Sequence, residues 1–100
     1  MSYSIIISAL AKRHLKESFK WYESQRISLG KEFRAEARVA IDKLADGMAD
    51  YQIYKDNIRK SSLHRFPYYI YYERMELTKE IIILAILHFK RSSEEIKRQI

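Results

Sequence analysis

The residues best suited to chemistry are basic and aromatic side chains in the second half of the chain. Two basic groups flank the tyrosine-rich segment 68–72: the first is Arg59, Lys60, His64 and Arg65, and the second is His88, Lys90 and Arg91. Arginines near a histidine suit phosphate binding and the stabilisation of a pentavalent phosphorane when an adjacent 2′-hydroxyl cleaves RNA. Neighbouring tyrosines can stack on bases. The arginines, the lysines and His64 are therefore candidates for binding a target.

A catalytic role would fall on four of these residues, namely Arg65, His88, Lys90 and Arg91. A structural interpretation stands beside it. Basic residues that alternate along a strand often form the solvent side of a half-buried sheet, and charges at sheet edges prevent aggregation. Tyrosines in such a segment are more simply explained by cross-strand packing. Anion binding is therefore favoured over catalysis, and both interpretations stay open.

The sequence lacks the patterns of most other catalytic sites. With Gly30 and Gly47 as the only glycines, there is no phosphate-binding glycine loop. The histidines form no H-E-x-x-H motif, and no G-x-S-x-G motif occurs. The absence of cysteine excludes disulfides, thiol catalysis and Cys-ligated metals. We therefore expect no metal and no cofactor.

The positive charge is uneven along the chain. Lys and Arg number 19 against 13 Asp and Glu, for a net charge of +6. Between residues 9 and 50 the basic and acidic residues nearly balance, whereas segment 55–65 carries four Lys and Arg against Asp56 alone. This excess in the second half favours a polyanionic or acidic partner.

The first half of the chain predicts a strand followed by two helices. Segment 3–8 is rich in β-branched residues and predicts a short strand, after which Ser8 can cap a helix. The helix carries one apolar stripe, formed by Ala11, Leu15, Phe19 and Tyr22. Trp21 lies beside this stripe, and we expect it to pack against the protein rather than to serve as a platform for a ligand. Ser28 is the expected cap of the second helix, and Gly47 its left-handed end. Its apolar side is Leu29, Phe33, Ala37, Ala40, Ile41, Leu44 and Met48.

The second half alternates with period two and predicts a sheet. Segments 51–54 and 58–64 form one strand or two short ones, broken at Asp56-Asn57. Segments 68–73 and 81–89 predict a hairpin closed by polar residues 76–80, and the last strand is apolar on both sides, as in a central strand. Antiparallel pairing would bring the two basic groups to the same end of the sheet. A short helix is expected to follow, capped by Ser92 or Ser93.

The predicted order is β-α-α-β-β-β plus a short terminal helix. It corresponds to the α+β class, with a helical hairpin packed on a small, mostly antiparallel sheet, in a single domain over residues 1–100. No signal peptide is visible, and the longest apolar run, 81–87, is far shorter than the roughly 20 residues that span a bilayer. We therefore expect a cytoplasmic protein with no membrane partner.

The predicted elements carry the residue patterns of a known toxin family. In the helices these are Trp21-Tyr22-Glu23, Gln25-Arg26, Leu29-Gly30, Phe33, Glu36, Ala40-Ile41 and Leu44. In the sheet they are Ile58-Arg59, Arg65-Phe66-Pro67-Tyr68-Tyr69-Ile70-Tyr71-Tyr72, Ile83-Leu84-Ala85-Ile86-Leu87-His88 and Lys90-Arg91. Together they resemble the RelE/ParE superfamily of toxins (plasmid stabilisation proteins), over nearly the whole chain and in the same order.

The resemblance implies the toxin component of a type II toxin–antitoxin system. Such a toxin arrests growth and is neutralised by a small cognate antitoxin, usually encoded beside it. The antitoxin wraps the toxin, and the complex binds operator DNA through the antitoxin. A basic toxin with an acidic partner fits the charge of this chain.

The resemblance leaves the target open between two classes. RelE-like members are metal-independent endoribonucleases that cut mRNA on the ribosome, often with a tyrosine near the C-terminus, whereas ParE-like members inhibit DNA gyrase. Arg59, Arg65, Lys90 and Arg91 could fill the basic roles of a nuclease, but the C-terminal tyrosine is missing. The W-Y-E and R-F-P-Y segments are closer to the ParE-like branch, which favours gyrase. A non-toxic regulatory relative is the third alternative.

Overall fold

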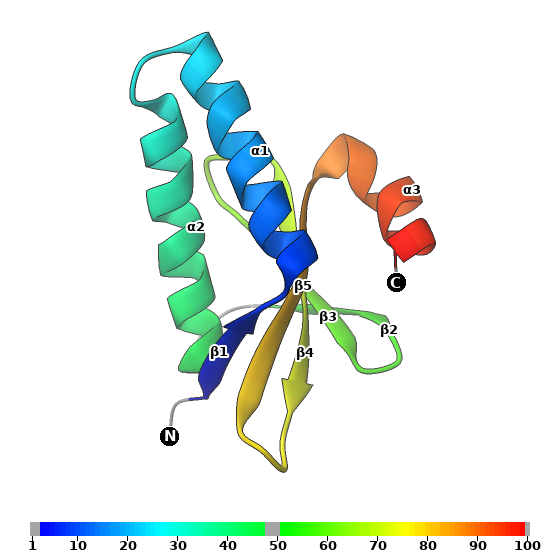
Figure 1. Cartoon of the computed structure of the whole chain (residues 1–100). Helices are drawn as coiled ribbons and strands as arrows, with labels where there is room; N and C mark the ends of the chain where they lie inside the picture. The colour runs from blue at the N-terminus through cyan, green and yellow to red at the C-terminus, as the bar shows by residue number, and fades with distance from the viewer. Residues whose placement is uncertain (1–2, 48–50, 100) are drawn as a thin grey trace.

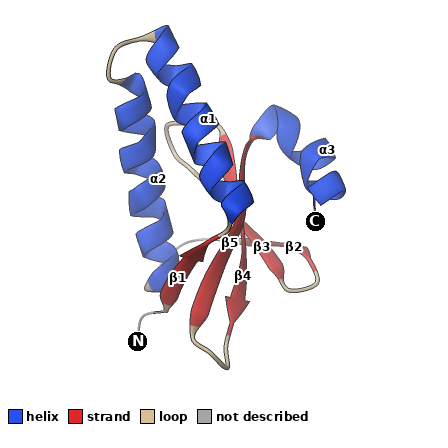
Figure 2. Ribbon diagram, in the orientation of Figure 1, coloured by secondary structure: helices blue, strands red, loops and turns tan. Residues whose placement is uncertain are grey.

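The computed structural model describes residues 3–47 and 51–99 of the chain. Its elements, in chain order, are β1 (Ser4–Ile7), α1 (Ala9–Gln25), α2 (Leu29–Ala45), β2 (Gln52–Lys55), β3 (Ile58–Ser62), β4 (Tyr68–Met75), β5 (Glu80–His88) and α3 (Phe89–Gln99). The α+β class is confirmed, with two strands rather than one before β4 (Figures 1 and 2). None of the helices in the described ranges is long and apolar enough to cross a membrane.

The five strands form one sheet in the order β1-β5-β4-β3-β2. β1 pairs in parallel with β5, and the other neighbours are antiparallel, so the mostly antiparallel sheet is confirmed. β5 is central, as its two-sided apolar pattern predicted. The α1–α2 hairpin covers one face of the sheet, and α3 packs against the opposite face through Ile96, which joins Tyr71, Ala85 and Leu87 in a small second core (Figure 1).

A β-bulge in β5 changes which residues face the helical hairpin. Tyr71 pairs with Ala85 and Tyr72 with Ile83, so Leu84 is an extra residue in the ladder. Ile83, before the bulge, faces α1 and α2. Strict alternation would place residue 85 on the same face next, but because of the bulge Ile86 takes that place and Ala85 faces α3. The bulge therefore sets the side of the sheet on which the end of β5 presents its residues.

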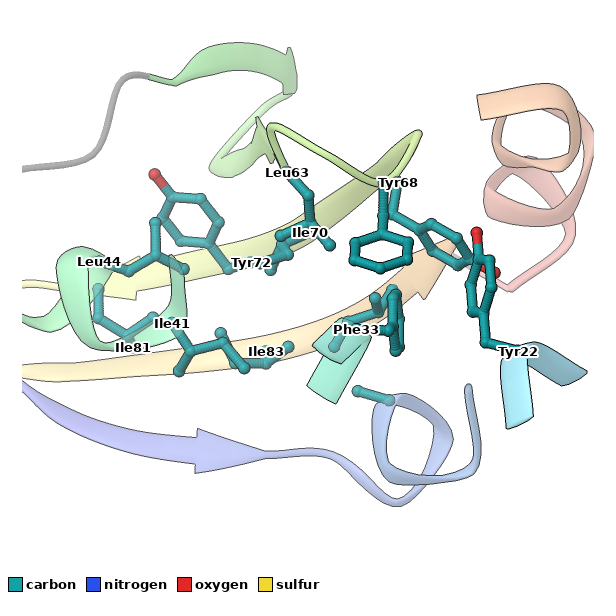
Figure 3. Close-up of a cluster of buried hydrophobic side chains, with 13 residues drawn as sticks. Tyr22, Phe33, Ile41, Leu44, Leu63, Tyr68, Ile70, Tyr72, Ile81 and Ile83 are labelled. Carbon is teal, nitrogen blue, oxygen red and sulfur yellow. The ribbon is translucent and has the colours of Figure 1, made fainter. Parts of the chain in front are cut away.

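The main core has a cluster of aromatic rings at one end and mostly aliphatic side chains at the other. Figure 3 shows Tyr22, Phe33 and Tyr68 together at one end, and Ile41 and Ile81 at the other. The Tyr22 and Phe33 rings stack with centroids 5.3 Å apart. These residues come from both helices and from the two central strands, so the core fixes the hairpin against the sheet.

α1 begins where the sequence predicted. The Oγ of Ser8 accepts a hydrogen bond from the N–H of Ala11 at 3.0 Å, so Ser8 is the N-cap. Ala11 and Tyr22 of the expected stripe are buried, whereas the expectation that Trp21 packs is wrong, because 57% of Trp21 is exposed. Its neighbour Tyr22 packs in the core instead. Because successive residues of a helix point about 100° apart, the side chain of Trp21 is directed away from that core.

The cap of α2 is not Ser28, which corrects the sequence prediction. The backbone of Ser28 is left-handed (φ 72°) and its side chain makes no capping hydrogen bond. Glu23 caps the helix instead: its Oε1 accepts from the N–H of Gly30 at 2.8 Å and from that of Lys31 at 3.3 Å. A carboxylate at a helix N-terminus also interacts favourably with the helix dipole.

The end of α2 follows the prediction. Gly47 has φ +69°, and its N–H donates to the carbonyl of Leu44 at 3.2 Å, as in a left-handed C-cap. The buried residues of the helix are Gly30, Phe33, Ala37, Ile41 and Leu44. Met48, expected on the same face, lies outside the described residues.

α3 begins at Phe89, three to four residues before the predicted cap at Ser92 or Ser93, so that prediction is wrong. The strand runs directly into the helix. The N–H of Phe89 donates to the carbonyl of Pro67 at 2.8 Å, and the N–H of Lys90 donates to Nδ1 of His88 at 3.0 Å. The imidazole of His88 thus satisfies a donor of the first turn, a role that the sequence analysis assigned to serine.

Candidate functional site

The predicted meeting of the two basic groups at one end of the sheet is confirmed only in part. His64 and Arg65, directly before β4, lie at the end of the sheet where β5 finishes, whereas Arg59 and Lys60 pair farther along β4. Tyr68 pairs with His88, and the N–H of Phe89 donates to the carbonyl of Pro67. The segment before β4 therefore lies beside the end of β5. The side chains of the two groups, however, point to different surroundings.

Arg59 and Lys60 lie on opposite faces of the sheet. Arg59 pairs with Tyr72 on the face covered by the hairpin, with its guanidinium 4.3 Å from the ring centroid of Tyr51. Lys60 pairs with Tyr71 on the α3 face, and its Nζ lies 4.3 Å from the ring centroid of Tyr69. Burial raises the pKa of Tyr72, and the charge of Arg59 partly opposes this effect. The two cations cannot act on one phosphate from these positions.

His64 and Arg65 are attached to α2. Both backbone N–H groups donate to Oε2 of Glu36, at 2.7 and 3.0 Å. The side chain of Arg65 forms an ion pair with Glu32 at 2.8 Å, and Arg26 forms a second one at 3.1 Å. Hydrogen bonds from Arg65 and then Arg26 hold the pKa of Glu32 below its ordinary value. The Arg65 guanidinium is thus engaged by an acidic residue of the hairpin.

His88 and Arg91 share a cavity of about 700 Å³ between α1 and the end of β5. The α1 wall consists of His14, Glu17, Ser18, Trp21 and Tyr22. The remaining lining residues are Tyr68, Ile86 and Leu87. The ring of His88 meets that of Tyr68 edge-on, with centroids 5.4 Å apart. Lys90 is exposed and does not line this cavity.

His14 is a buried residue of this wall that the sequence analysis did not single out. It is 6% exposed, and its Nδ1 accepts a hydrogen bond from the N–H of Ile86 at 3.1 Å. A neutral imidazole that accepts at Nδ1 carries its proton on Nε2. The signal was present in the spacing, because His14 lies three residues after Ala11 on the same helical face.

Tyr22 and Tyr68 join the cavity to the aromatic core. Their ring centroids are 6.1 Å apart, and burial together with the neighbouring Tyr68 raises the pKa of Tyr22 far above its ordinary value. The phenol of Tyr22 therefore stays protonated at neutral pH and acts as a hydrogen-bonding group. Within the described residues, no group of three or more His, Asp or Glu side chains is placed to hold a metal ion.

Comparison with known proteins places these features in a family. Residues 5–92 match the family described as the ParE toxin of the type II toxin-antitoxin system parDE. The chain belongs to the ParE toxin family. The resemblance to the RelE/ParE superfamily, and to its ParE-like branch, is thereby confirmed. A search of curated proteins gave no match to this ParE-family toxin.

Solved structures share the fold of the ParE-family toxin. The chromosomal ParDE system from P. aeruginosa matches with a TM-score of 0.74 at 19% identity, over 87% of this chain and 96% of that one. A RelBE toxin–antitoxin complex from Mycobacterium tuberculosis matches with a TM-score of 0.62 at 14% identity, over 88% and 92%. A mutant of the E. coli toxin RelE in the free state matches with a TM-score of 0.55 at 11% identity, over 99% and 94%.

The ParE-family toxin thus combines a type II toxin fold with a divided set of candidate residues. Of the seven residues singled out in the sequence, the structure brings only His88 and Arg91 to one cavity. The opposite wall of that cavity comes from α1, which the sequence analysis treated as scaffold. Among the residues of that wall, the sequence analysis considered only Trp21 as a possible ligand platform, and it favoured packing for this residue.

Proposed function

We propose that this ParE-family toxin arrests growth by binding DNA gyrase and that a cognate antitoxin neutralises it. The dispersal of the basic residues carries this proposal. Cleavage of RNA needs a proton acceptor, a proton donor and phosphate-stabilising cations around one phosphate. Here Arg59 and Lys60 lie on opposite faces and Arg65 is paired with Glu32. A toxin that acts by binding does not need these groups to converge.

The sequence after Arg91 supports the same choice. No tyrosine occurs between residues 92 and 100, where RelE-like nucleases often carry one. The two fold relatives with the highest similarity described above are a ParDE system and a RelBE toxin–antitoxin complex, which supports an antitoxin partner. The net charge of +6 suits an acidic antitoxin. We place the action of the protein in the cytoplasm, with operator DNA bound only through the antitoxin complex.

The test is supercoiling of relaxed plasmid by purified gyrase in the presence of the purified toxin. We expect inhibition that rises with toxin concentration and is relieved by the antitoxin. Relief by antitoxin is the control for nonspecific binding of a basic protein to DNA. Normal supercoiling at a large molar excess of folded toxin would contradict the proposal.

One observation favours the alternative, a RelE-like, metal-independent mRNA endoribonuclease. His88 and Arg91 line one cavity with Tyr22 and Tyr68, a combination that offers a proton-transfer group, a cation and stacking surfaces. Mapping of mRNA 5′ ends after induction tests it. Codon-phased cuts that disappear in Arg91→Ala would establish the nuclease, whereas arrest without cuts would eliminate it. Absence of arrest would instead indicate the non-toxic regulatory relative.

A further inference from the structure

The outer side of the α1–α2 hairpin, turned away from the sheet, carries a group of basic side chains. Its members are Lys12, Arg13, Lys16 and Lys20 of α1 and Lys31, Arg34 and Arg38 of α2. All seven of these residues are exposed. On each helix they recur at spacings of three and four, so each helix presents its cations along one side. This surface is termed the cationic face.

A cation–π contact joins the two rows of the cationic face. Arg34 of α2 reaches across to α1, where its guanidinium lies 4.6 Å from the ring centroid of Phe19. The two helices are antiparallel (Figure 1), so Arg38, one turn after Arg34, comes alongside the turn of α1 that carries Lys16. The two rows therefore form one continuous surface.

The near balance of charge in this half of the chain does not extend to the cationic face, because most of the acidic residues are used elsewhere. Glu23 caps α2, and Glu32 and Glu36 hold the loop before β4. Glu17 lines the cavity between α1 and β5, and Asp42 lies at the end of the α2 row. In the part of the chain that the structure describes, no ion pair forms at any of the seven cations. Their charge is therefore available to a partner.

The apolar side chains around the cationic face argue against a protein partner there. Protein interfaces depend on buried aromatic or aliphatic anchors at their centre. Here Phe19 is covered by Arg34. Val39 is 54% exposed, but it follows Arg38 and so points about 100° away from it, and Ile27 lies in the turn at the end of the hairpin. A surface of Lys and Arg around a covered ring fits the phosphate backbone of a nucleic acid better.

The same arrangement favours a duplex over a single strand. Proteins that bind single strands place aromatic rings under successive bases. The exposed ring of α1, that of Trp21, instead lines the cavity on the other side of the helix. In duplex DNA the bases stack on one another, and the phosphates lie outside with one charge per about 1.7 Å of helix axis. Two rows of cations on packed helices suit such a dense and regular array of charge.

We propose that the cationic face binds the phosphate backbone of duplex DNA without reading its sequence. Recognition of an operator is a separate property, because it needs contacts to base edges. The inference goes beyond gyrase inhibition and requires neither gyrase nor an antitoxin. Combined with the proposed function, it means that the toxin is held on the substrate of its target.

Fluorescence anisotropy of a labelled duplex, titrated with the purified full-length toxin, measures this binding. We expect equal affinity for two duplexes of unrelated sequence and weaker binding of a single strand of the same length. Because each neutralised phosphate releases counterions, the logarithm of the binding constant should fall linearly with that of the salt concentration, with a slope of about −0.9 for each phosphate contacted. Binding that is independent of salt, or that differs between the two duplexes, would overturn the inference.

Two double variants with the same net charge test the place of binding. Lys16→Ala with Arg38→Ala removes one cation from each row, whereas Lys43→Ala with Lys55→Ala removes two exposed cations outside the cationic face. We expect the first to weaken DNA binding about 10-fold or more at low salt and to make the salt slope shallower by about 2, and the second to stay within about twofold of the wild type. Alanine favours the helix at both α1 and α2 positions, and thermal melting establishes that both proteins are folded.

The outcomes separate this inference from the proposed function. Equal DNA binding by the two double variants would show that net charge, and not this face, is responsible, and would overturn the inference. Poly-glutamate serves as the probe for acidic proteins; if it binds as tightly as DNA and is lost in the same variant, the face belongs to a protein partner and the inference also fails. The titration contains no gyrase, and the supercoiling assay judges gyrase inhibition, so either proposal can fail while the other stands.

Discussion

Gly30 lies where α1 leaves no room for a side chain. A Cβ at this position would come within 2.5 Å of the carbonyl oxygen of Phe19 and 2.7 Å of Cγ of Glu23. Because the first neighbour is backbone, the helices would have to separate. We predict that Gly30→Ala destabilises the protein by about 1–3 kcal/mol, despite the better helix propensity of alanine. Urea denaturation measures the loss, and Lys31→Ala, at the exposed neighbouring position, is the control; equal stability of both variants would contradict the prediction.

His14 gives a second prediction at the scale of one residue. Its Nδ1 is the acceptor for the N–H of Ile86, in a buried place where water cannot readily substitute. His14→Leu removes the acceptor and should cost about 1–3 kcal/mol of unfolding free energy, the penalty of an unsatisfied buried donor. His14→Asn, whose side-chain oxygen can take the position of Nδ1, should lose less. If both variants unfold at the same urea concentration, the hydrogen bond is not what His14 contributes.

These residues show where sequence reasoning reached its limit. The helical spacing placed Ala11 and Tyr22 in the core, and it places His14 on the same face, yet a polar residue type gave no reason to expect burial. Arg59 and Lys60 are adjacent in a strand, so their opposite orientation follows from period-two alternation alone. The cap by Glu23 could not be foreseen, since it depends on the conformation of the turn that brings a carboxylate back onto α2.

At the scale of elements, ion pairs connect α2 to the loop before β4. Glu32 has its pKa lowered by Arg65 and Arg26, and a carboxyl group with a depressed folded-state pKa stabilises the fold above its unfolded-state pKa. This stability is lost as the pH falls through the folded-state value. We predict that Glu32→Gln lowers the melting temperature slightly at pH 7 and that the difference from the wild type disappears in acid, below about pH 4.

Thermal melting over a pH series checks the Glu32 prediction, with Asp42→Asn on the same helix as the matched control. A difference between Glu32→Gln and the wild type that persists unchanged into acid would show that the ionised carboxylate is not responsible. The pair is exposed, so added salt should also reduce the difference.

Most elements followed from their periodicity, and the exceptions have physical causes. The hairpin of β4 and β5 was predictable because both strands are rich in β-branched and aromatic residues and polar residues separate them. The start of α3 was not predictable. The acceptor for the N–H of Lys90 is the imidazole of His88, which is also the last residue of β5. A helix that continues a strand without a loop lacks the usual capping signal.

At the scale of the whole molecule, we expect the net charge of +6 to attract an acidic partner. We predict that the association rate of the antitoxin falls by roughly an order of magnitude between low and high salt, because screening removes long-range attraction. Stopped-flow mixing measures this rate. The dissociation rate serves as the internal control and should change much less, since it depends on close contacts. Association independent of salt would mean that charge does not steer the complex.

The bulge at Leu84 determines which residues at the end of β5 face the helical hairpin and which face α3. If β5 kept its length but paired without the bulge, the alternation up to Ile83 would continue, and position 88 would turn to the α3 side of the sheet. His88 would then leave the cavity, although no residue of the cavity had been substituted. Loss of the bulge at constant strand length would thus turn over the whole terminal segment, whereas deletion of Leu84 itself would remove the bulge and leave that segment on its present faces. Relatives with a strand of the same length but no bulge should therefore display a different wall at this place, even where their residues match.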